Sequence, residues 1–154
     1  MTDGNTATKL VPISPELAEG AFAIGRTTTF TKTVGESDIY LFAGVSGDLG
    51  PNHVDEEYMS KTRYGRRIAH GVLIVSYMST CSSKLIEEAG NEPAVSYGYD
   101  RVRFVKPVFI GDTVTVTYTV AERDDERGEI RSQVTAKNQH GDVVAVATHI
   151  LRRV

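Results

Sequence analysis

The chain has 154 residues, 40% of them hydrophobic and 24% charged, which fits one globular domain with one core. The formal net charge is −3, and no basic cluster is large enough to indicate nucleic acid or an anionic membrane as the main partner. The single cysteine, Cys81, cannot form an intrachain disulfide, and no apolar run reaches the ~18 residues of a membrane span. With no apolar signal-peptide segment at the N-terminus either, we expect a cytoplasmic protein.

The first third of the chain predicts a tail followed by a strand. Residues 1–20 are polar and small with little periodicity, so we expect a tail or a loosely packed lead-in there. We expect residues 21–154 to form a single domain. Within it, residues 26–34 are rich in threonine, whose β-branched side chain suits a half-exposed strand.

Two short helices are predicted next. The first can be capped by Ser37 or Asp38, carries several apolar residues and ends at residues 46–48. After a glycine-proline turn, Asp55 can cap a second helix over residues 56–61.

The longest helical pattern covers residues 71–89. Its apolar residues recur at the spacing of one helix face, and they are Ile74, Val75, Met78, Cys81, Leu85 and Ala89. Small serines and threonines fill much of the remaining surface, which suits close wrapping by a sheet. Gly90 and Asn91 provide a C-terminal stop.

From residue 94 onward the hydrophobic pattern changes to period two. Four predicted strands cover residues 94–104, 114–120, 130–137 and 143–151, with turns short enough for antiparallel neighbours. One strand, then helices, then four antiparallel strands predict an α+β fold. A five-stranded antiparallel sheet wrapped around one long central helix is the hot-dog fold.

Two neighbouring motifs carry the chemistry. The first reads Ser46-Gly47-Asp48-Leu49-Gly50-Pro51-Asn52-His53, and the second reads Ile68-Ala69-His70-Gly71. The first puts a carboxylate and an imidazole on a turn shaped by glycine and proline. The second opens the long helix with a glycine, whose backbone N–H is exposed at the helix N-terminus. An acid, a base and an exposed N–H are the groups needed to add water across an activated double bond.

With these two motifs in register, the chain resembles the MaoC-type, or (R)-specific, enoyl-thioester hydratases. The segment Phe104-Val105-Lys106-Pro107-Val108-Phe109-Ile110-Gly111-Asp112 is similar to that family's Phe-x-x-Pro-Val-x-x-Gly-Asp strand entry. The resemblance covers nearly the whole chain from about residue 25 onward. It implies the hot-dog fold, a place in fatty acid metabolism, and reversible addition of water to trans-2-enoyl thioesters.

The resemblance also implies the roles of single residues. Asp48 and His53 hold and activate one water, and the imidazole is the better base because it titrates near neutral pH. The Gly71 N–H polarises the thioester carbonyl and holds the enolate. Ser79, about two turns along the helix, matches a position that contacts the catalytic histidine. We expect His70 to be structural and to orient the turn at Gly71.

One position departs from the family's pattern. The usual asparagine between the aspartate and the proline is Gly50 here, and Asn52 is a candidate to supply an amide instead. We expect Gly50, Pro51 and Asn52 to support the loop. If Gly50 has a negative φ, an asparagine there should leave activity unchanged or raise it, whereas a positive φ would make a side chain strain the turn.

Four residues before Gly71 are predicted to contact substrate, and they are Arg66, Arg67, Ile68 and Ala69. Together with Arg63, the two arginines form the densest basic group of the chain. Such a group is either a solvated turn or a contact to phosphate on a small ligand.

The remaining histidines, His140 and His149, are too scattered for metal-ligand spacing, so we expect no metal. No motif indicates a cofactor, and coenzyme A or an acyl carrier protein is expected only as the carrier of the substrate. We expect a homodimer or a dimer of dimers, because one chain leaves an edge strand and an end of the ligand channel uncovered.

Two alternative functions stay open. One is a hot-dog thioesterase, which would release free thiol. The other is a non-catalytic acyl-thioester-binding domain, which the departure at Gly50 keeps open.

Overall fold

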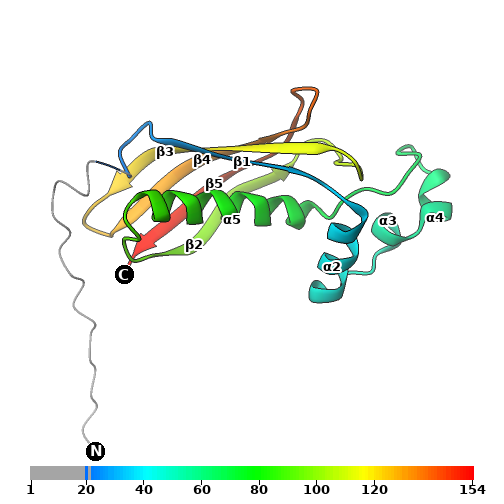
Figure 1. The fold of residues 1–154 in the computed structure, drawn as a ribbon, viewed down its shortest axis with the longest axis horizontal. Coiled ribbons are helices and arrows are strands. Elements are labelled where there is room, and N and C mark those ends of the chain that lie inside the picture. Colours follow the sequence, from blue (N-terminus) through cyan, green and yellow to red (C-terminus); the bar gives the residue numbers. More distant parts are fainter. Residues whose placement is uncertain (1–19, 21) are drawn as a thin grey trace, which may run out of the picture.

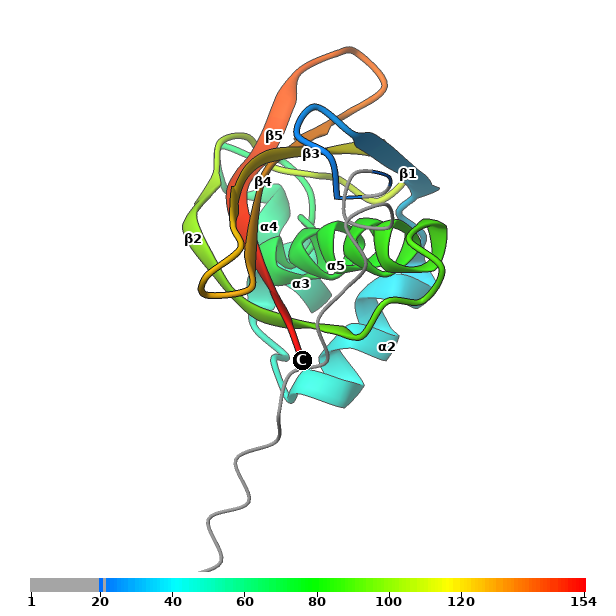
Figure 2. The same cartoon turned by 90° about the vertical axis from the view of Figure 1, so that its left-hand side faces the viewer.

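The computed structural model describes residue 20 and residues 22–154, so the expected lead-in lies almost wholly outside the described residues. Five antiparallel strands form one sheet in the order β1-β3-β4-β5-β2. Their bounds are β1 Thr27–Thr33, β2 Ala94–Phe104, β3 Thr113–Asp124, β4 Glu129–Lys137 and β5 Val143–Arg153. The sheet curls around α5, Gly71–Glu88, as Figures 1 and 2 show from two directions. The predicted hot-dog arrangement is therefore confirmed.

The threonine-rich strand β1 is explained by its neighbour. β3 buries every second residue against the helix, including Val114, Val116 and Tyr118, and turns its threonines to the outer face. Three of these threonines meet threonines of β1, and the pairs are Thr27–Thr119, Thr31–Thr115 and Thr33–Thr113 with hydroxyl separations of 2.9, 3.0 and 2.7 Å. Such cross-strand hydroxyl pairs stabilise the outer face of a two-sided sheet.

Helix α5 packs its apolar face into the sheet. Ile74, Met78, Cys81 and Leu85 are buried as the periodicity predicts, whereas Val75 is only partly buried. The buried face is wider than the predicted stripe, because Leu73, Tyr77 and Ser82 are buried too. A sheet that curls around a helix covers more of its circumference than a flat sheet does. Within the described residues, no helix is long and apolar enough to cross a membrane.

Three short helices lie beyond the sheet at the end where α5 begins (Figure 1). They are α2 Glu36–Ser46, α3 Pro51–Val54 and α4 Glu56–Ser60. The N-cap of α2 is Gly35, not Ser37 or Asp38 as expected, and Asp38 instead accepts a hydrogen bond from the Gly35 N–H at 2.8 Å. Asp55 caps α4 as predicted, accepting from the Tyr58 N–H at 2.8 Å.

Strand β2 is one edge of the sheet and is the more exposed one. It pairs only with β5, and its register shifts between Ser96 and Gly98 and again between Asp100 and Arg103. Three of its large apolar side chains are exposed, namely Val95, Tyr97 and Phe104. An uncovered apolar edge of this kind is a surface that proteins usually pair or cover.

Candidate active site

The loop between α2 and α3 brings a carboxylate and an imidazole together. His53 lies in α3 and is 7% exposed, whereas the Asp48 side chain is 50% exposed. Asp48 Oδ2 is 3.9 Å from His53 Nε2, and Asp48 Oδ1 accepts from the Gly50 N–H at 3.1 Å. The 3.9 Å separation is too long for a direct hydrogen bond, but a water can lie at hydrogen-bonding distance from both atoms. The geometry therefore fits a shared water.

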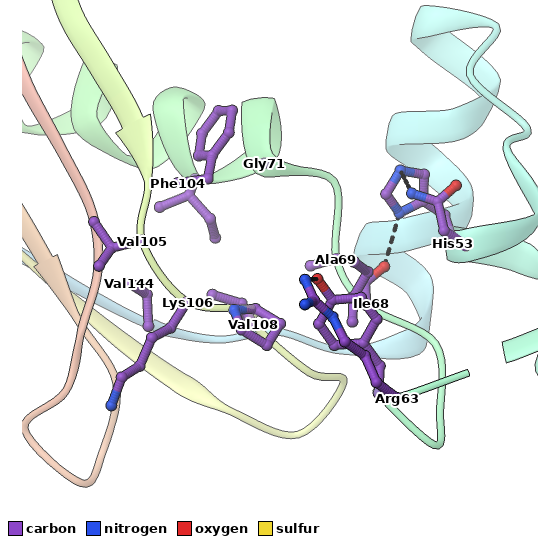
Figure 3. A pocket seen from close by; sticks show the side chains of 14 residues that line it. His53, Arg63, Ile68, Ala69, Gly71, Phe104, Val105, Lys106, Val108 and Val144 are labelled. Atoms are coloured by element: carbon purple, nitrogen blue, oxygen red, sulfur yellow. Dashed lines mark hydrogen bonds between the residues drawn. The ribbon is translucent and has the colours of Figure 1, made fainter. Parts of the chain in front are cut away.

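The other nitrogen of His53 is fixed by the backbone. His53 Nδ1 is 2.8 Å from the Ile68 carbonyl oxygen, which can only accept, so Nδ1 carries a proton (Figure 3). In the neutral ring, Nε2 is then the acceptor. Asn52 Nδ2 lies 3.0 Å from that nitrogen. In the same segment, the Ile68 N–H donates to the Asn52 carbonyl at 3.0 Å, which ties α3 to the start of the second motif.

His70 is structural in this fold, as expected. It is 1% exposed, its Nε2 donates to the Asp48 carbonyl oxygen at 2.9 Å, and its ring stacks on His53 with centroids 3.7 Å apart. It is also the N-cap of α5, so it links the Asp48 loop to the helix that begins at Gly71.

Gly71 is the first residue of α5, and its N–H has no partner within the helix. A Cβ at this position would lie 2.7 to 2.8 Å from three carbons of the Phe104 ring. The absence of a side chain at Gly71 therefore makes room for Phe104, which Figure 3 shows beside it.

His53 and Gly71 line a cavity of about 560 Å³, whereas Asp48 and His70 are not among its lining residues. From the predicted site, His53, Asn52, Gly71, Ile68 and Ala69 line it. The other lining residues, which the sequence did not single out for this role, are Arg63, Tyr64, Ile74, Phe104, Val105, Lys106, Pro107, Val108 and Val144. Most lining residues are therefore apolar, with two cations, Arg63 and Lys106, and the imidazole of His53 among them.

The two arginines predicted to contact substrate do not line this cavity. Arg67 is bound to Glu36 at 2.8 Å and Glu56 at 2.9 Å, and its side chain is only 14% exposed. Its hydrogen bonds lower the pKa of the Glu56 carboxyl, and those from Glu56 and Glu36 raise the pKa of Arg67 itself. Arg67 therefore ties α2 to α4. The Arg66 guanidinium lies over the Phe109 ring at 4.1 Å, and it is Arg63 that reaches the cavity.

Ser79 does not contact His53. It lies eight residues along α5 from Gly71, or about 12 Å at the helical rise. Burial raises the pKa of the Tyr99 phenol, and the Ser79 hydroxyl beside it opposes that rise. Tyr99 in turn stacks on His149, which bonds to Tyr118 and Ser96. Burial lowers the pKa of His149 to about 4, so this histidine is a neutral packing residue at physiological pH.

Asp48, His53 and His70 bring ligand-type atoms within 4.8 Å of one another. His53 Nδ1 and His70 Nε2 donate to the Ile68 and Asp48 carbonyls. The ring nitrogens that remain are His53 Nε2, which Asn52 Nδ2 contacts at 3.0 Å, and His70 Nδ1, which has no hydrogen-bond partner among the described residues. The expectation that the protein needs no metal and no cofactor stays a prediction.

A family model described as "MaoC like domain" matches residues 20–143. The chain belongs to the MaoC-like domain family. An (R)-specific enoyl-CoA hydratase of Rhodospirillum rubrum is 43% identical over 96 residues, which are 62% of this chain and 64% of that protein. The chain therefore aligns with a little under two thirds of that relative. A 3-hydroxybutyryl-CoA dehydratase of Methylorubrum extorquens is 34% identical, over 73% of this chain and 69% of that protein.

The fold of this MaoC-like domain is shared with a solved hydratase. The R-hydratase PhaJ1 of Pseudomonas aeruginosa, in its unliganded form, matches with a TM-score of 0.73 and 30% identity, covering 84% of this chain and 81% of that one. Most of the cavity residues that the sequence did not reveal belong to two parts of this fold. Arg63 and Tyr64 follow α4, and residues 104–108 form the end of β2 and the segment after it, while Ile74 of α5 and Val144 of β5 complete the wall. For residues 104–108, the sequence did contain a signal, namely the segment from Phe104 to Asp112 that resembles the family's strand entry.

Proposed function

We propose that this MaoC-like domain is an (R)-specific enoyl-thioester hydratase, which also runs backwards as a 3-hydroxyacyl-thioester dehydratase. The observation that carries the proposal is the 3.9 Å gap between Asp48 Oδ2 and His53 Nε2, next to a cavity that His53 and Gly71, the first residue of α5, both line. The names of the relatives support it.

His53 is the base in the hydration direction. Its Nε2 lone pair takes one proton from the shared water while Asp48 Oδ2 orients that water, and the hydroxide oxygen bonds to Cβ of the trans-2-enoyl thioester. The Cα–Cβ π electrons move to the thioester oxygen as an enolate. The proton that His53 Nε2 took from the water then passes to Cα, relayed by Asp48, as the enolate collapses, so one water is added and His53 returns to its unprotonated form. Proton transfer of this kind contributes ~10²–10⁴ in rate.

The Gly71 N–H is placed to stabilise the enolate. It stands at the N-terminus of α5, an 18-residue helix, where unpaired N–H groups and the helix dipole favour negative charge. One such donor contributes roughly 3 kcal/mol to transition-state stabilisation.

The carrier and the assembly are part of the same proposal. Arg63 and Lys106 line the cavity and can meet the phosphates of coenzyme A or of an acyl carrier protein's arm. Lys106 is paired with Asp142 at 2.6 Å, while Arg63 donates to the Tyr64 hydroxyl at 2.7 Å. The exposed apolar edge of β2 favours a homodimer joined edge to edge. The cytoplasmic location stays a prediction.

Incubation with crotonyl-CoA tests the activity. Loss of the enoyl absorbance without release of free thiol supports the hydratase. Thiol release would show a thioesterase instead, and neither signal would favour a binding domain. Asp48→Asn should abolish most of the enoyl loss, whereas Glu122→Gln, an exposed carboxylate on β3, should leave it unchanged.

A further inference from the structure

The Asn52 side chain occupies an unusual place between the loop glycine and the candidate base. Its Nδ2 is 3.0 Å from His53 Nε2. Its Oδ1 lies 2.7 Å from the point where a Cβ of residue 50 would stand. One amide therefore fills the space that a side chain at position 50 would need and also touches the His53 nitrogen that lies nearest Asp48.

The hydrogen bonds around the ring determine what this amide does. Because the Ile68 carbonyl accepts from Nδ1–H, a neutral ring has its lone pair on Nε2, and the Asn52 N–H donates to it. A donor aimed at Nε2 stabilises the unprotonated nitrogen and disfavours a proton there. The amide thus holds the ring in the form that a base for water needs.

We propose that Asn52 is a positioning residue for the hydration reaction, holding His53 with Nε2 unprotonated and on the side of Asp48 until the reacting water replaces the amide. This role rests on the proposed hydratase activity. Asn52 occupies the space that a side chain at residue 50 would need, and Gly50 leaves that space free. Gly50 has φ −54° and ψ 137°, so its backbone accepts other residues, and the conflict with Asn52 is steric rather than conformational.

The same geometry predicts that the amide can be moved to position 50. A Cβ built on Gly50 lies 3.6 Å from His53 Cδ2, the ring carbon next to Nε2, and an asparagine side chain extends beyond its Cβ by enough to reach that nitrogen. It would also lie 3.1 Å from Asp48 Oδ1. With Asn52 present the two side chains collide, and with Asn52 shortened to alanine they do not.

Three ionisable groups lie near His53 or line the same cavity, and they can contribute to the pH dependence of the hydration rate. Asp48 lies 3.9 Å from Nε2, the His70 ring stacks on the His53 ring at 3.7 Å, and Arg63 lines the same cavity. All three remain in the variants below, so differences in pH profile among those variants report the change at residue 52.

The test compares kcat, KM and the pH profile of crotonyl-CoA hydration in Asn52→Leu, Asn52→Ala and Asn52→Asp. Loss of one neutral hydrogen bond predicts a fall in kcat of roughly tenfold with little change in KM. The acidic limb of the kcat profile should move to higher pH in Asn52→Leu and Asn52→Ala, and further in Asn52→Asp, whose carboxylate favours a protonated ring. Asn91→Gly, in an exposed turn with φ 59°, is the control and should match the wild type.

A double variant at residues 50 and 52 distinguishes a role of Asn52 in positioning His53 from a role in stabilising the fold. Gly50→Asn alone should lower kcat, contrary to the expectation from the negative φ of Gly50, because the new Cβ would stand 2.7 Å from Asn52 Oδ1. Gly50→Asn with Asn52→Ala should restore kcat to within a few-fold of the wild type. A nitrogen-15 NMR spectrum of the His53 ring provides a readout without substrate, because loss of the amide donor shifts the Nε2 resonance. If the wild type does not hydrate crotonyl-CoA, the proposed function fails while this spectrum still tests the contact.

An acidic limb and an Nε2 resonance that stay unchanged in Asn52→Leu would overturn the proposal. So would a double variant no better than Gly50→Asn alone. A fall in kcat that follows only a lower melting temperature, with no change in pH profile, would show that Asn52 merely stabilises the loop.

Discussion

The contact between Gly71 and Phe104 gives the sharpest prediction for a single substitution. In Gly71→Ala, the new Cβ would stand 2.7 to 2.8 Å from three ring carbons. Carbon atoms pack best at about 3.5–4.0 Å, so either the ring or the start of α5 must move by about 1 Å. Phe104 is 52% exposed at the end of an edge strand, so its ring can move, but the cavity is beside it.

Either movement disturbs the site. A shift of the helix start moves the Gly71 N–H relative to His53, and a shift of the ring narrows the cavity where the thioester binds. Misplacement by ~1 Å costs on the order of 10² in rate, so we expect kcat of Gly71→Ala to fall by about that factor. Stability should fall by only about 1–3 kcal/mol, the usual range for one added methyl group in a packed site.

The assay is the initial rate of enoyl loss from crotonyl-CoA for Gly71→Ala, Phe104→Ala and the double variant. If the ring is what the new methyl group meets, the double variant should recover most of the rate lost in Gly71→Ala. Equal losses with and without Phe104 would refute the reasoning, because they would show that the methyl group collides with the substrate itself.

Three further predictions concern the buried histidine, the assembly and the product. Burial lowers the pKa of the His149 imidazole from 6.5 to about 4, so the unfolded chain binds a proton at this residue more readily than the folded chain does. The contribution of His149 to the free energy of unfolding is therefore full above pH 6.5 and is lost as the pH falls toward 4. This group contributes up to about 3 kcal/mol to the free energy of unfolding, so denaturant titrations from pH 7 to 4.5 should show a smaller loss in His149→Gln than in the wild type or in His140→Gln. Light scattering should show a homodimer whose formation is weakened by Tyr97→Lys on β2, and a stable, fully active monomer would contradict it. Chiral analysis of hydrated crotonyl-CoA should give the (R)-3-hydroxy thioester, and an (S) product would remove the chain from its relatives' mechanism.

The regular elements were predictable because their signals are local. The period of α5 and the alternation of β3 both follow from burial of one face, and Asp55 caps α4 as its position suggests. The helix α3 was not predicted, because its four residues begin with Pro51 and resemble a turn. The cap of α2 was placed two to three residues late, because Gly35 has no side chain to indicate it.

In the candidate site, too, some residues are marked by local motifs, and others depend on partners far away in the sequence. Asp48, His53 and Gly71 could be singled out as candidates because their motifs are short and in register, and the sign of φ at Gly50 was left open until the structure provided it. The roles of the arginines depend on distant partners. Arg67 meets acids 11 and 31 residues away, which no local pattern reveals, so it was predicted to contact substrate while Arg63 lines the cavity.

The central claim is that Asp48 and His53 act together on one water, and a double-mutant cycle on crotonyl-CoA hydration tests it most directly. Asp48→Asn and His53→Ala should each lower kcat by roughly 10²–10⁴ without loss of fold. Because both groups serve the same water, the double variant should lose little more than the more damaging single variant. A loss in the double variant equal to the product of the two single losses would contradict the claim, because it would mean that the two groups act independently.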